Sequence, residues 1–150
     1  ILSRPKLDRF TMKLKDKEYI LKLIRYHGIQ MNPGFSTVYQ LSFEYGYDFI
    51  KDLIVIKRAD NLAKAPKAHY QVLKCDAFDG DMARIIEEKW PLQVQDLLVG
   101  AKDCIALGLP RERIGEVLKS TLNEVVSSEC GSDYKAQFKI LEGVLTHVVY

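Results

Sequence analysis

The chain has 150 residues, 47% of them hydrophobic and 28% charged, which is the composition of one globular domain or of two small helical lobes. No run is apolar for long enough to span a bilayer, and the first residues lack a signal-peptide core, so we expect no membrane partner. The net charge is +2, but residues 1–74 carry 14 Lys/Arg against 7 Asp/Glu, an excess that favours a phosphate-rich partner unless these cations simply face solvent.

The first part of the chain predicts three helices. Asp16 can cap a helix over about residues 17–27, and Ser36 can cap a second helix that ends near residue 45. A third helix is predicted over residues 47–65, and its apolar side carries Phe49, Ile50, Leu53, Ile54 and Ile56.

Asp60 falls on the apolar side of this third helix. A carboxylate at such a position must be paired, hydrogen-bonded or bound to a ligand. We therefore expect Asp60 to form an ion pair with Arg25, Lys57 or Arg58.

Residues 67–90 are helical by composition, but Asp79-Gly80-Asp81 interrupts the pattern. We read this segment as a turn that divides the region into two helices or one broken helix. It resembles part of a calcium loop, yet the required spacing of oxygen ligands is missing.

The stretch 96–118 is marked by glycine and proline. Gly100 and Gly108 should bound a short segment, and Pro110 should start a long helix over residues 111–126. Gly115 inside that helix should permit a close neighbour, because a mid-helix glycine costs about 1 kcal/mol against alanine. Ser132 can cap a last helix. Since no strand alternation persists, the predicted class is all-α.

The three cysteines, Cys75, Cys104 and Cys130, are far apart and form no CxxC pair. This pattern argues against a disulfide framework or a zinc site and fits a reducing cytoplasm. We expect three small, partly buried side chains.

Three segments carry a resemblance to a known family. The stretch DLLVGAKDCIALGLPRERIGEVL, residues 96–118, resembles the C-terminal body of bacterial CCA-adding tRNA nucleotidyltransferases of the poly(A) polymerase family. Upstream, LIRYH at residues 23–27 and KRADNLA at residues 57–63 resemble parts of the family's HD-like domain. The resemblance implies a helical bundle in which residues 1–65 are the C-terminal part of the HD-like domain and residues 66–150 are the helical body and tail.

The resemblance also implies a function. The family adds CMP and AMP, from CTP and ATP, to the 3′ end of tRNA, and its catalytic head holds Mg²⁺ with an Asp-x-Asp pair. Nothing in this chain matches that head. We therefore expect a tRNA-binding portion, not catalytic by itself and without a cofactor of its own, whose partners are tRNA and a missing N-terminal head.

Five cations are candidate RNA contacts. Helix N-termini with arginines suit phosphate, which favours Arg111, Arg113 and Lys119. Lys22 and Arg25, in a basic stretch with Lys13, Lys15 and Lys17, are an equally good candidate. The alternative is an exposed charged surface with no ligand.

His27 and Asp60 match positions at or near the metal in HD phosphohydrolases. Activation of water needs several ligands around the metal, and these two residues alone do not supply them. A remnant of an HD-type metal-dependent phosphohydrolase is therefore one alternative function. A non-enzymatic helical interaction module is the other.

Overall fold

The computed structural model describes residues 13–28, 34–64 and 70–149, and in these ranges it contains helices and no strand. The predicted all-α class is confirmed. None of the helices in these ranges is both long and apolar enough to cross a membrane. In chain order the helices are α2 (Leu14–Tyr26), α3 (Phe35–Tyr45), α4 (Tyr47–Leu62), α5 (Tyr70–Glu87), the 3-10 helix η2 (Val94–Asp96), α6 (Ala101–Ala106), α7 (Arg111–Ser128) and α8 (Tyr134–Val149).

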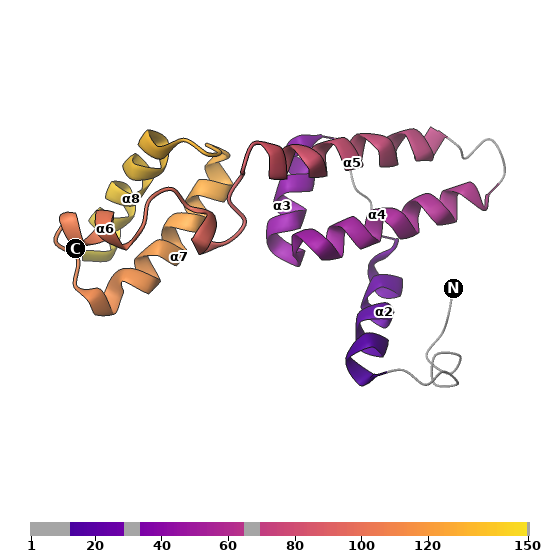
Figure 1. The fold of residues 1–150 in the computed structure, drawn as a ribbon, viewed down its shortest axis with the longest axis horizontal. Coiled ribbons are helices and arrows are strands. Elements are labelled where there is room, and N and C mark those ends of the chain that lie inside the picture. The colour runs from indigo at the N-terminus through magenta and orange to yellow at the C-terminus, as the bar shows by residue number, and fades with distance from the viewer. Residues whose placement is uncertain (1–12, 29–33, 65–69, 150) are drawn as a thin grey trace.

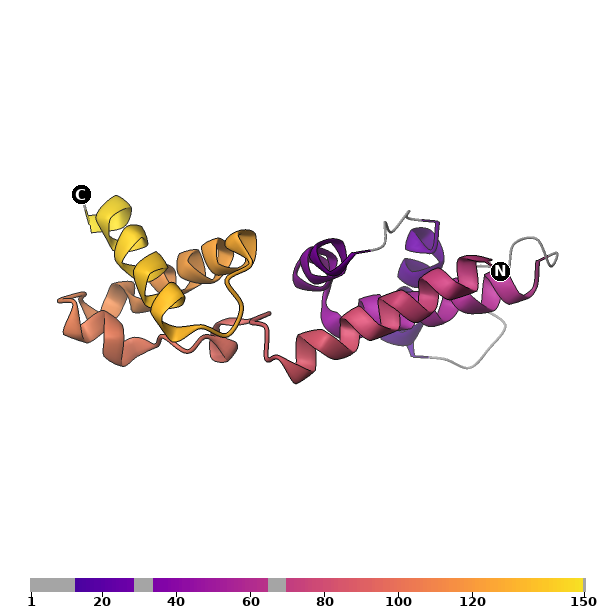
Figure 2. The same cartoon turned by 90° about the horizontal axis from the view of Figure 1, so that it is seen from above.

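Two groups of helices follow one another along the longest axis of the molecule (Figure 1 and Figure 2). In the first group α3, α4 and α5 pack on one another, and α2 packs on α4. In the second group α7 packs along α8 and also contacts α6 and η2. The predicted division at residues 65 and 66 falls between α4 and α5, two helices that pack against each other.

The core of the first group is built on the predicted apolar face of α4. Ile50, Leu53 and Ile54 are each 1% exposed, and Phe49 is 5% exposed. They form one cluster with buried side chains of α3 and α5. Because burial of such a side chain contributes roughly 1.5–3 kcal/mol, this face fixes how α4 lies between its neighbours.

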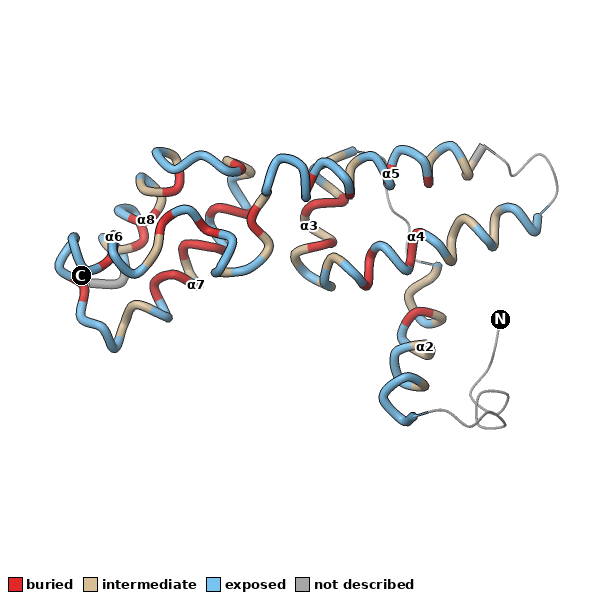
Figure 3. The backbone as a smooth tube through the Cα atoms, viewed as in Figure 1, coloured by how far each residue is buried: buried red, intermediate tan, exposed pale blue. Residues whose placement is uncertain are grey.

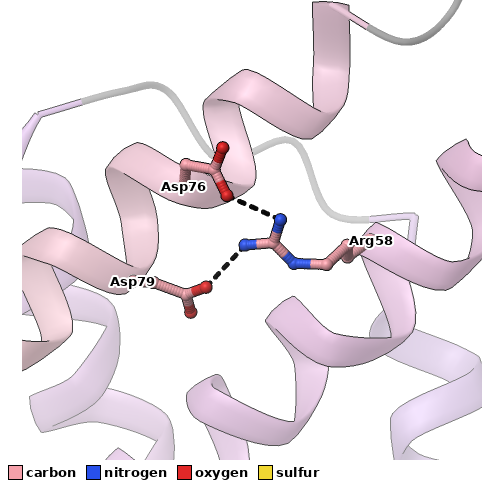
Figure 4. A network of polar contacts seen from close by, with 3 residues as sticks. All are labelled: Arg58, Asp76 and Asp79. Carbon is pink, nitrogen blue, oxygen red and sulfur yellow. Dashed lines mark hydrogen bonds and ion pairs between the residues drawn. The ribbon is translucent and has the colours of Figure 1, made fainter.

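Helix α5 runs through Asp79-Gly80-Asp81 without interruption, so the predicted turn there is wrong. Burial of apolar side chains spaced three or four residues apart outweighs the cost of about 1 kcal/mol that Gly80 imposes on a helix. Asp79 joins Asp76 on the outer side, and both carboxylates pair with Arg58 of α4 at 2.6 Å (Figure 4). The buried side chains of α5 are Cys75, Phe78, Met82 and Ile85.

Three predicted helix starts differ from the observed ones. Helix α2 begins before Asp16, which lies in its first turn, and α3 begins before Ser36. Helix α8 is capped by Asp133 and not by Ser132, since the Asp133 carboxylate accepts two backbone N–H groups of the first turn at 3.0 and 3.3 Å. The Ser132 hydroxyl donates instead to the backbone carbonyl of Lys89, just after α5, at 2.8 Å.

The turn between α6 and α7 forms as predicted. Gly108 has φ +88°, a conformation that favours glycine, and Pro110 directly precedes α7. Gly100 precedes α6, and its N–H donates to Asp103 at 2.8 Å. Gly115 differs from the prediction, because a Cβ built there would meet no atom of the described chain within 4 Å.

The single tryptophan, Trp90, joins the two groups of helices. Its ring centre lies 4.7 Å from that of Phe35 and 5.0 Å from that of Tyr39, both on α3. On the side of the second group, a Cβ added to Gly131 would lie 3.4 Å from the indole. The buried Tyr39 hydroxyl also donates to the Pro91 carbonyl at 2.7 Å. The junction is therefore a packed aromatic cluster.

Two glutamine side chains bind backbone groups of segments that are distant in sequence. Gln137 is 0% exposed, accepts the Leu98 N–H at 2.8 Å and donates to the Gly131 carbonyl at 2.9 Å. Gln40 of α3 donates to the Val126 carbonyl near the end of α7 at 2.9 Å. The Gln137 amide joins two loops within the second group of helices. The Gln40 amide joins α3 of the first group to α7 of the second.

Candidate functional site

Helix α2 leaves most of its surface to solvent, and only Leu23 is buried among its residues (Figure 3). One face holds it to α4. The Tyr19 hydroxyl donates to Asp52, which raises the pKa of Tyr19 to about 12 because ionisation would break that bond. The Tyr26 ring lies edge-on to Phe49, with 6.1 Å between the ring centres. These contacts fix the rotation of α2 and hence the direction of its other side chains.

A neighbouring face of α2 carries exposed cations. Lys15, Lys22 and Arg25 are spaced seven and three residues apart, which places them on one side of the helix. None of them forms an ion pair with a carboxylate of the described residues. The Lys22 ammonium lies 4.3 Å from the centre of the Phe49 ring, and the Arg25 guanidinium lies 5.6 Å from that of Tyr26.

Lys22 and Arg25 also line a groove of about 360 Å³ on α2. The other described residues along it are Glu18, Leu21 and Tyr26. A glutamate followed four residues later by a lysine commonly pairs with it on a helix surface. Here the lysine head lies on an aromatic ring instead, and Glu18 has no ion pair with any cation of the described chain. The groove therefore presents charges of both signs that form no ion pair with one another.

The other predicted cations, Arg111, Arg113 and Lys119, lie on α7, in the second group of helices (Figure 1). The structure does not bring them together with the cations of α2. The Arg113 side chain lies 3.9 Å from the Glu116 carboxylate and lines a groove of about 360 Å³ that Glu142 also lines. Carboxylates thus interrupt this surface, and it forms no continuous basic patch.

Asp60 pairs at 3.0 Å with Lys64, which is four residues further along the chain and lies two residues past the end of α4. This hydrogen bond lowers the pKa of the Asp60 carboxyl. Asp60 is thus paired, as expected, but the partner that the structure gives is Lys64, whereas Arg58 pairs with Asp76 and Asp79. The position lies near the end of the helix, where the carboxylate is 41% exposed and the helical wheel no longer indicates burial.

His27 lies directly after α2, and its Nδ1 is hydrogen-bonded to the carbonyl of Ile24. A positive charge on its ring would favour the ionised form of Asp60, but the His27 and Asp60 side chains form no hydrogen bond or ion pair with each other. In the described ranges no three side chains among His, Cys, Asp and Glu come together as metal ligands. The two predicted metal ligands therefore have no third partner there.

All three cysteines are free thiols. Cys75 and Cys104 are buried and Cys130 is half-buried, as expected. Burial raises the pKa of each thiol, which keeps it protonated and weakens it as a nucleophile.

Sequence reasoning identified the cations of α2 but did not assign Glu18 or Tyr26 to the same surface. The four-residue spacing from Glu18 through Lys22 to Tyr26 was the available signal, since such residues share one helix face. Comparison with known proteins finds no relative: no family model matches the chain, and neither a curated protein nor a solved structure matches it.

Proposed function

We propose that this chain is a non-catalytic helical module that binds the phosphate backbone of structured RNA through α2. The observation that carries the proposal is the exposed row of Lys15, Lys22 and Arg25, three cations without an ion pair to the described carboxylates. Phosphate contacts supply most of the affinity of proteins that hold nucleic acids without reading their sequence.

The resemblance to CCA-adding enzymes supports tRNA as the RNA. In that reading, the addition of CMP and AMP belongs to a catalytic head elsewhere, together with Mg²⁺, CTP and ATP. This chain would hold the double-helical part of the tRNA by its backbone and shape, as the deep major groove of an RNA helix demands.

The packed junction around Trp90 supports a holding role. Its aromatic contacts and the Gln40 hydrogen bond fix the second group of helices against α3. Helix α2 is in turn fixed on α4 by Tyr19 and Tyr26. A rigid arrangement orders fewer side chains and loops on binding, so less of the interaction energy is lost.

The test is the binding of a fluorescent tRNA minihelix, with acceptor stem and T-arm, measured by anisotropy at several salt concentrations. Three phosphate contacts predict that log K falls with log salt with a slope of about −2.7, which is a loss of about 40-fold when the salt concentration rises fourfold. Replacing Lys15, Lys22 and Arg25 by Gln should remove most of this binding and flatten the slope.

The matched control replaces three exposed lysines of the second group, Lys102, Lys135 and Lys139, by Gln. It removes the same charge at a distance from α2 and should leave the slope nearly unchanged. Equal losses in the two variants, or no binding by the unmodified chain at low salt, would refute the proposal. Circular dichroism of each variant confirms that the helices are retained.

A further inference from the structure

The groove on α2 has a composition that a bare phosphate does not explain. Lys22 and Arg25 suit a phosphate, but the Glu18 carboxylate in the same groove repels one. Leu21 and Tyr26 add apolar surface that a phosphate cannot use. A ligand that matches all of these groups has an anionic part, a flat apolar part and hydrogen-bond donors, which is the description of a nucleotide.

The aromatic side of the groove is held in place. The Tyr26 ring lies 5.6 Å from Tyr45 and 6.1 Å from Phe49, between ring centres. The planar Arg25 guanidinium lies over the Tyr26 ring, 5.6 Å from its centre, and extends this surface. Unpaired RNA bases commonly stack on aromatic rings or on arginine guanidinium planes, so the groove offers a stacking surface that does not need to form on binding.

Glu18 selects among the bases. An ionised carboxylate only accepts hydrogen bonds, and it has two oxygens that can accept them side by side. Guanine presents two adjacent N–H donors, N1–H and the exocyclic amino group, on its Watson–Crick edge. Adenine and cytosine place an acceptor nitrogen beside their single amino group, and uracil flanks its one N–H with two carbonyl oxygens. Only guanine therefore offers a matching pair of donors.

We infer that the groove formed by Glu18, Lys22, Arg25 and Tyr26 binds an unpaired guanine nucleotide of the RNA. The inference rests on the proposed function, because Lys22 and Arg25 hold the adjoining phosphate. The base lies against Tyr26 and Arg25, and its donor edge meets Glu18. The guanine must be unpaired, since a Watson–Crick partner would occupy both donors.

The experiment compares RNA hairpins that are identical except for one bulged nucleotide, which is guanine, adenine, cytosine or uracil, together with the fully paired hairpin. We expect the guanine bulge to bind about tenfold more tightly than the paired hairpin and than the other bulges. The variant Glu18→Gln should lose this preference, because glutamine presents one acceptor and one donor. Its affinity for the paired hairpin should stay equal or rise, since a negative charge is removed.

The control variant is Glu112→Gln, which makes the same charge change at an exposed position of α7. It should keep the preference for guanine. If Glu18→Gln strengthens binding to all hairpins equally, Glu18 acts only by repulsion and the inference is overturned. If the unmodified chain binds all hairpins equally with the predicted salt slope, the inference fails while the proposed function stands. If no hairpin binds at low salt, both fail.

Discussion

Replacement of Gln137 by leucine tests whether the second group of helices depends on one buried amide. The side chain is 0% exposed and makes two hydrogen bonds to backbone groups of two loops, Leu98 N–H and the Gly131 carbonyl. Leucine has a similar volume but leaves both groups without that partner. An unsatisfied buried polar group costs about 1–3 kcal/mol, so two cost about 2–6 kcal/mol. Because Leu98 is itself exposed and water can reach its loop, we expect a loss of about 3 kcal/mol.

The free energy of unfolding is measured by urea denaturation, with circular dichroism and Trp90 fluorescence as independent probes. The control is Gln95→Leu, at an exposed position, which should change stability by less than about 0.5 kcal/mol. If Gln137→Leu changes stability no more than this control does, the two hydrogen bonds do not hold the loops together and the reasoning is refuted.

The variant Gln137→Glu sharpens the same test. Its carboxyl can still accept the Leu98 N–H, but it can donate to Gly131 only when protonated. Burial should raise the pKa of this carboxyl in the folded protein above its unfolded value of about 4.3. The favourable protonated form is then fully present below the unfolded pKa, and its contribution is lost as pH rises through the folded pKa. Relative to the unmodified protein, the variant should therefore become less stable as pH rises. A constant difference across pH would contradict the assignment.

Three further outcomes follow from the structure. Gly115→Ala should stabilise the protein by about 1 kcal/mol and raise Tm by about 3 °C, because nothing lies within 4 Å of the added Cβ, whereas Gly108→Ala should lower Tm because φ there is +88°. A calorimetric scan that shows the reverse order would be inconsistent with this account. Trp90→Ala should lower stability by about 3 kcal/mol in urea denaturation followed by circular dichroism, and an unchanged midpoint would mean that the aromatic junction contributes little. The pKa of Asp103 is lowered in the folded protein, chiefly by the hydrogen bond from Tyr134. The stability that ionised Asp103 contributes is therefore present above its unfolded pKa of about 4 and is lost as pH falls through the folded pKa. In the variant Asp103→Asn, Tm should fall less steeply as pH is lowered. The same decrease of Tm with pH in the variant and the unmodified protein would contradict this prediction.

Helix boundaries followed the sequence closely where local chemistry decides them. Gly108 and Pro110 lie at helix ends as predicted, because glycine tolerates positive φ and the φ of proline suits the start of a helix. The start of α8 was misplaced by one residue, since Ser132 and Asp133 can both cap a helix. The position of Lys89, whose carbonyl accepts the Ser132 hydroxyl, decided between them.

The unbroken course of α5 was not predictable from local propensity. Asp79-Gly80-Asp81 favours a turn in isolation, but the flanking apolar side chains are buried against α3 and α4. In addition, Asp76 and Asp79 find a common partner in Arg58, which lies far away in sequence. A long-range contact therefore overrides a local preference here.

The candidate site shows the same division. The sequence alone determined the all-α class, the apolar face of α4 and the excess of cations in the first half, because helical periodicity and composition are local properties. Only the tertiary structure decided which cations stay unpaired. Packing of α2 on α4 places the Lys22 ammonium over Phe49 and not in an ion pair with Glu18, and packing of α5 on α4 brings Asp76 and Asp79 to Arg58. For Lys22 and Arg58 the contact depends on where a neighbouring helix lies, and that is set by packing and cannot be read from spacing along the chain.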